Sequence, residues 1–92
     1  MNITARNILA HELIGIEAEI VESEDPTLKF SGKIVYETKN MLMFLVKNEM
    51  KMISKKAVKL MLTLPDSTRC LVDGVDLLGR PEDRIQRLAY HG

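Results

Sequence analysis

Residues 32–46 read GKIVYETKNMLMFLV, and this stretch decides the fold. Alternation over Lys33–Thr38, with Ile34 and Tyr36 on one side, predicts a half-buried strand. Met41–Lys47 is apolar on both faces and predicts a second, more deeply buried strand. The polar residues between the two segments predict a tight turn. The stretch therefore indicates a β-hairpin of an antiparallel sheet.

Four more strands are expected in total, one before this hairpin in the sequence and three after it. Alternation begins again at Ile16 and ends before Asp25-Pro26, because proline lacks the N–H group that a central strand needs. The remaining predicted strands are Met50–Ser54, Ala57–Leu64 and Thr68–Val72. Short strands separated by turns favour a small, strongly bent antiparallel barrel, since closure removes exposed sheet edges.

A helix is expected at each end of the chain. Thr4 is a suitable N-cap and Gly15 a suitable helix stop, whereas Pro81 followed by two acidic residues opens a second helix. The prediction is a mainly β, single-domain protein of residues 1–92. Its parts are an N-terminal helix (1–15), a barrel of five to six strands (16–73) and a C-terminal helix (80–90).

Charge is distributed unevenly along a chain whose formal net charge is zero. Residues 1–27 carry six acids and one base, residues 28–60 carry eight lysines and two acids, and residues 61–92 carry four arginines and five acids. Such asymmetry favours a polyanionic partner, or two different partner surfaces. The alternative is that the strands simply present charges to water.

Chemistry on the chain itself is not expected. His11 and His91 lie in opposite terminal segments, and Cys70 is the only cysteine. Asp73 and Asp76 are better explained as turn residues than as metal ligands, because no third ligand follows at a suitable spacing. We therefore expect no catalytic residue, metal, cofactor or small-molecule ligand.

The apolar residues indicate a buried core rather than a membrane span. The longest apolar run, Met41–Val46, has six residues, well short of the ~18 that a membrane helix needs. A cytoplasmic location is expected. The six methionines are expected to fill the core, and a methionine-rich binding groove is the alternative.

Basic residues at predicted turns are the candidates for RNA contact. Lys39 and Asn40 lie in one turn, Lys55-Lys56 in another, and Arg80 and Arg84 flank the second helix start. Lysine binds phosphate without strict geometry, and aromatic residues make up only 4% of the chain. This pattern favours recognition of the backbone and shape of a folded RNA over base stacking.

Three stretches, taken together, resemble a known family. They are Thr4–Ile8 with His11–Gly15, then Gly32–Leu42, and finally Asp73-Gly74 with Leu78–Arg84. In this order they resemble archaeal ribonuclease P protein component 1, the family that includes the eukaryotic subunit Pop four.

The resemblance implies an Sm-like barrel with flanking helices, in a ribonucleoprotein that removes 5′ leaders from precursor tRNA. It also implies that the RNA subunit performs the hydrolysis and that a zinc-ribbon subunit is the protein partner. The residues predicted to bind ribonuclease P RNA are Lys33, Thr38, Lys39, Asn40, Lys55, Lys56, Arg80 and Arg84. Those predicted to meet the protein partner are Ile8, Leu9, His11, Glu12 and Leu13.

Two other functions remain open at this point. One is an Sm-like RNA chaperone that assembles into a homo-oligomeric ring. The other is a protein-interaction barrel that does not contact RNA.

Overall fold

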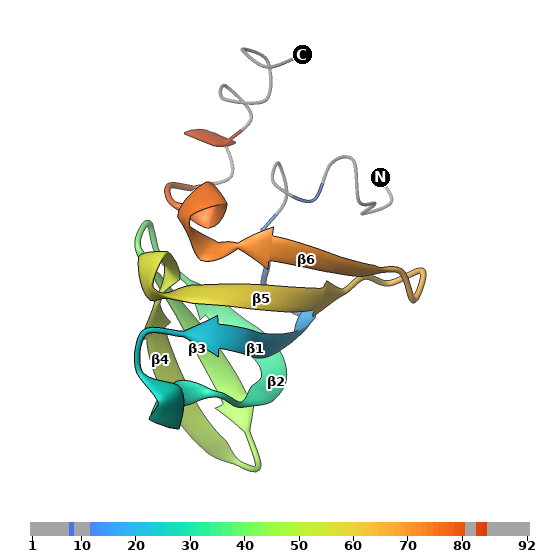
Figure 1. Ribbon diagram of the computed structural model, residues 1–92. Helices are drawn as coiled ribbons and strands as arrows, with labels where there is room; N and C mark the ends of the chain where they lie inside the picture. The colour runs from blue at the N-terminus through green and yellow to red at the C-terminus, as the bar shows by residue number, and fades with distance from the viewer. Residues whose placement is uncertain (1–7, 9–11, 81–82, 85–92) are drawn as a thin grey trace.

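The computed structural model describes residue 8, residues 12–80 and residues 83–84. Six strands form one antiparallel sheet in the order β4-β3-β2-β1-β5-β6 (Figure 1). Their bounds are β1 Glu17–Ser23, β2 Ser31–Glu37, β3 Met41–Val46, β4 Glu49–Ser54, β5 Val58–Thr63 and β6 Arg69–Asp73. All six lie within a few residues of the predicted strands, so the mainly β prediction is confirmed.

The sheet is bent so that its two halves face each other across the core. β1, β5 and β6 run across the front in Figure 1, and β3 and β4 cross behind them at a steep angle. Register irregularities at Ile20/Glu22 of β1 and Ile34/Tyr36 of β2 accompany the bend. Apolar side chains from both halves fill the space between them, including Ala18, Ile20, Ile34, Leu42, Phe44, Ile53, Leu60 and Leu62.

The prediction of a closed barrel was wrong. β4 and β6 stand at opposite ends of the strand order, and no pairing joins them within the described residues. Two 3-10 turns, η3 (Lys55–Ala57) and η4 (Gly74–Leu77), pack together at one end of the sheet instead. Gly74 has no side chain, and this lets η4 approach the η3 backbone closely.

A third 3-10 turn, η2 (Pro26–Leu28), connects β1 to β2 and ends the first strand where proline was predicted to end it. Asp25 caps this turn by accepting hydrogen bonds from the Thr27 hydroxyl at 2.7 Å and the Thr27 backbone N–H at 3.0 Å. Both bonds hold the pKa of Asp25 below its ordinary value, and the bond from the Thr27 hydroxyl has the larger effect.

The predicted terminal helices fall largely outside the described residues. Residues 13–16 form a turn rather than the end of a helix, with Gly15 at φ +93° and its N–H donating to the Ile34 carbonyl at 2.7 Å. Asp83 and Arg84 are helical, and their N–H groups donate to the Arg80 carbonyl at 2.9 and 3.1 Å. Within the described part of the chain, no helix is long and apolar enough to cross a bilayer.

Several predicted core assignments were also wrong, including the burial of β3 on both faces, since Leu45 is exposed. Tyr36 was expected to share the face of Ile34, but the irregularity between them turns Tyr36 outward and leaves it 54% exposed. Glu37 consequently turns inward opposite Leu42, a buried core residue. Met50 and Met52 do not fill the core either, because they lie on the outer face of β4.

Candidate nucleic-acid interface

A buried cluster of three charged side chains lies at one end of the sheet. Glu37 Oε2 is 2.7 Å from Lys55 Nζ and 2.7 Å from Arg84 Nη1. The side chains of both cations are fully buried and that of Glu37 is 5% exposed. Each ion pair therefore lies in a medium where charge attraction is much stronger than in water.

Backbone oxygens complete the surroundings of the two cations. Lys55 Nζ donates to the carbonyls of Gly79 at 3.1 Å and Lys39 at 3.3 Å. Arg84 Nη1 donates to the carbonyls of Gly79 at 2.8 Å and Leu77 at 3.1 Å. These partial negative charges complement Glu37, whose single charge faces two cations.

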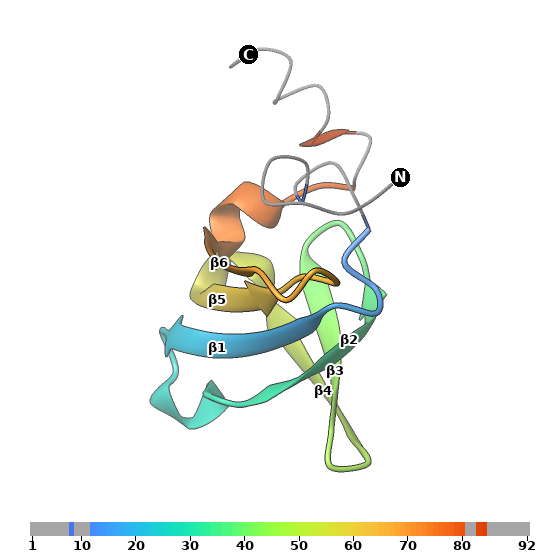
Figure 2. The same ribbon diagram turned by 90° about the vertical axis from the view of Figure 1, so that its right-hand side faces the viewer.

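The cluster links parts of the chain that lie far apart in sequence. Glu37 Oε1 accepts the Leu13 N–H at 3.1 Å, so the segment before β1 is tied to the end of β2. The Gly79 N–H donates to the Lys39 carbonyl at 2.8 Å and the Lys55 N–H to the Asn40 carbonyl at 2.9 Å. The β2–β3 turn, η3 and the segment after η4 are thereby held at the same end of the molecule (Figure 2).

Exposed residues of both signs surround the buried cluster, among them Asp83, whose Oδ2 accepts the Arg80 N–H at 3.3 Å. We call five uncharged or basic residues of this surface the basic end. They are Thr38, Lys39, Asn40, Lys56 and Arg80. The Thr38 hydroxyl accepts the Met41 N–H at 3.0 Å, which fixes the turn that carries Lys39 and Asn40. Five of the eight residues predicted from sequence to contact RNA thus lie together at one exposed end.

The structure contradicts the expected exposure of Lys55 and Arg84. Both side chains are buried against Glu37, so neither presents its charge to a ligand. Arg84 pairs with Glu37, 47 residues away in sequence. A signal for Lys55 was present, because Ile53 two residues earlier lies on the same inward face.

Lys33 lies apart from the basic end. It is exposed in β2, between Leu45 of β3 and Glu17 of β1 in the strand register. Its position is on the outer face of the sheet rather than at the turns.

The residues predicted to contact the protein partner differ in their burial. Ile8 and Leu13 belong to the hydrophobic core, which contradicts their expected role as a contact face. Glu12 is exposed. Leu9 and His11 lie outside the described residues.

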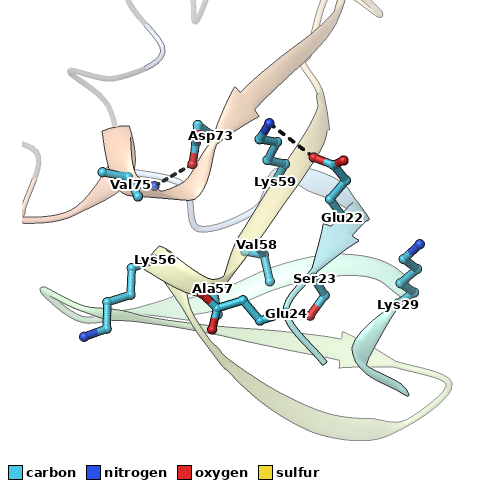
Figure 3. A pocket seen from close by; sticks show the side chains of 10 residues that line it. All are labelled: Glu22, Ser23, Glu24, Lys29, Lys56, Ala57, Val58, Lys59, Asp73 and Val75. Atoms are coloured by element: carbon cyan, nitrogen blue, oxygen red, sulfur yellow. Dashed lines mark hydrogen bonds and ion pairs between the residues drawn. The ribbon is translucent and has the colours of Figure 1, made fainter. Parts of the chain in front are cut away.

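An open groove of about 510 Å³ lies beside the basic end (Figure 3). Its charged lining is balanced, with Lys29, Lys56 and Lys59 against Glu22, Glu24 and Asp73. Lys59 pairs with Glu22 at 3.2 Å, whereas Lys56 points away from that pair in Figure 3. The groove therefore offers no concentrated charge of either sign.

No group of three or more histidine, cysteine, aspartate or glutamate side chains that could hold a metal ion occurs in the described part of the chain. A bent six-stranded sheet with basic residues gathered around one end describes a small β-sheet protein suited to a polyanion.

The chain belongs to the family described as ribonuclease P/MRP, subunit p29, whose profile matches residues 6–87. It is 45% identical over 89 residues to ribonuclease P protein component 1 of Thermofilum pendens, covering 95% of each chain. It is 37% identical over 86 residues to that of Methanocaldococcus jannaschii, covering 92% of this chain and 90% of the relative.

A solved structure shares the fold. Mth11, described as a homologue of the human ribonuclease P protein Rpp29, aligns with a TM-score of 0.59 and 30% identity. The alignment covers 80% of this chain and 97% of Mth11. These findings confirm the resemblance drawn from the sequence motifs.

Proposed function

We propose that this chain acts in ribonuclease P by binding the RNA subunit through its basic end, in support of 5′-leader removal from precursor tRNA. The observation that carries the proposal is the gathering of Lys39, Lys56 and Arg80 at one exposed end by a buried ionic cluster. Exposed cations brought together at one end suit the phosphates of a folded RNA, because backbone contacts position a protein without reading bases. Membership of the family places the chain in an endoribonuclease complex.

The test is the triple variant Lys39→Ala, Lys56→Ala and Arg80→Ala, titrated with ribonuclease P RNA at several salt concentrations. Each lost phosphate contact reduces the slope of log affinity against log salt by roughly 0.7–0.9. We expect the variant to bind more weakly and with a slope shallower by about 2 to 3 units. Its melting temperature should change little, because exposed charges contribute only about 0–1 kcal/mol to stability.

The matched control is Glu17→Gln with Glu19→Gln, which alters two exposed charges on β1 away from the basic end. RNA affinity should not fall in this control. A loss of affinity equal to that of the triple variant would show that the RNA surface has been placed on the wrong face.

We further propose that the isolated chain has no nuclease activity and that the RNA subunit carries out the hydrolysis. Membership of a ribonuclease P subunit family supports this division of labour. Protein freed of all RNA should leave precursor tRNA intact over a range of Mg²⁺ concentrations, as followed by gel electrophoresis. Metal-dependent cleavage by that preparation would contradict the proposal.

The zinc-ribbon subunit is the protein partner that we propose, and a cytoplasmic location is proposed with it. The exposed carboxylates of β1, Glu17 and Glu19, supply a surface that repels RNA and suits a basic protein. Since Ile8 and Leu13 are committed to the core, this proposal rests on the charged surface and not on those side chains.

A further inference from the structure

An apolar surface lies on the outer side of β2, β3 and β4, facing away from the core. Tyr36 pairs with Met43, and Met43 with Met52, so these three side chains form one row across the strands. Leu45 pairs with Met50 in the next row. Directly paired residues on antiparallel strands share a face, so the five side chains form one continuous patch, which we call the methionine face.

The methionine face is open to solvent. Met50 is 57% exposed, Met52 is 53% exposed, and Leu45 and Tyr36 are also exposed. A contiguous apolar patch of this kind on a small protein marks an interaction site, whereas isolated exposed apolar residues do not. Methionine side chains are flexible and polarizable, which suits them to adapt to another protein surface.

The charges around the methionine face are mainly positive. Lys33 adjoins Leu45 in the strand register, Lys47 lies in the β3–β4 turn and Lys39 in the β2–β3 turn. Glu49 pairs with Lys51 at 3.7 Å, and Lys51 lies over the Phe30 ring, on the other side of β4. Glu17 of β1 pairs with Lys33 of β2, so it is the carboxylate next to these lysines in the strand register.

This arrangement distinguishes between possible occupants. Packing the methionine faces of two copies together would bring their lysines into proximity, which disfavours a second copy of the chain. An RNA base would find a single ring, Tyr36, among sulfur and aliphatic groups, whereas stacking platforms use aromatic rings for successive bases. A polypeptide with apolar side chains flanked by carboxylates matches both the patch and its rim.

We propose that the methionine face is a docking site for an acidic, amphipathic segment of another protein. The apolar side of that segment would cover Met43, Met50 and Met52, and its carboxylates would meet Lys33 and Lys47. This interaction goes beyond the proposed RNA binding and does not depend on it.

The test uses the full chain with ¹³C-labelled methionine methyl groups, observed by NMR. The probe is a synthetic helical peptide with leucines along one side and glutamates along the flanks, and the matched probe carries lysines in place of the glutamates. We expect the glutamate peptide to shift the Met43, Met50 and Met52 signals. Met61, which pairs with Glu19 and Leu71 elsewhere on the sheet, should not shift.

The double variant Met50→Ser with Met52→Ser should bind the glutamate peptide at least about tenfold more weakly, because apolar contact area is lost. Leu71→Ser changes another exposed apolar residue, on β6, and is the control that should bind normally. An unchanged melting temperature would show that both variants fold, and an unchanged Met61 signal would confirm it for the double variant, whose substitutions lie away from Met61.

Several results would overturn the proposal. One is that millimolar glutamate peptide shifts none of the methionine signals, and another is that the lysine peptide shifts them equally. A third is that a single-stranded RNA oligonucleotide shifts the same methyl groups in place of the peptide. The last is that the signals shift with protein concentration alone. The last result would assign the methionine face to a second copy of the chain.

Discussion

Replacing Glu37 by glutamine should destabilise the protein by about 3–5 kcal/mol, the cost typical of removing one partner from a buried ion pair. Glutamine has nearly the same shape and keeps an oxygen for the Leu13 N–H. The substitution removes the charge that lies 2.7 Å from both Lys55 Nζ and Arg84 Nη1. Both cations would stay buried without that compensation.

Such a loss is a large part of the total stability of a small domain, which is about 5–15 kcal/mol. In domains of this size each kcal/mol shifts the melting temperature by about 4–8 °C, so a fall of more than about 10 °C is expected. Urea unfolding followed by circular dichroism measures the free energy directly. RNA affinity should fall as well, because the Glu37 cluster holds the turns of the basic end together.

Two further variants separate the loss of charge from other effects. Glu19→Gln removes an exposed carboxylate 3.5 Å from Arg69 and should cost no more than about 1 kcal/mol. Lys55→Met should cost less than Glu37→Gln, because Glu37 then keeps Arg84 as its partner. Equal stability of Glu37→Gln and wild type would show that the cluster does not hold this end together.

The strands were predictable because alternation and turn residues act over a few positions. Asp25-Pro26 ended the first strand as expected, and the polar residues after β2 formed the predicted turn. The irregularity after Ile34 was not predictable in this way. It adds one position to β2, so the inward and outward assignments of Tyr36 and Glu37 are exchanged.

The candidate site was predictable in part for the same reason. Lys39, Lys56 and Arg80 are exposed because they lie at turns or element ends, where a local pattern is informative. Lys55 and Arg84 are buried because each meets Glu37, at 18 and 47 residues' separation. Such pairing depends on the way the sheet bends, so the spacing of the charges along the sequence does not predict which of them form ion pairs.

Replacing Gly74 by alanine should cost about 3 kcal/mol, the upper end of the usual range for overpacking. A Cβ atom at this position would collide with the Lys55 carbonyl oxygen and come within 2.7 Å of the Val58 carbonyl oxygen. Both obstacles are backbone atoms, so no side-chain rotation can relieve the contact and η3 must separate from η4. Thermal and urea unfolding measure the loss.

Gly15 supplies the contrast, because nothing lies within 4 Å of a Cβ built there and its φ is +93°. Strain at Gly15 comes from the backbone, so asparagine, which tolerates positive φ, should be accepted better than alanine. At Gly74 the obstacle is steric, and asparagine should be worse than alanine. Because opening the η3–η4 contact displaces Lys56 relative to Arg80, Gly74→Ala should also weaken RNA binding at temperatures where the protein is still folded. A variant that keeps full stability and full RNA affinity would show that the close approach of η4 to η3 does not position the basic end.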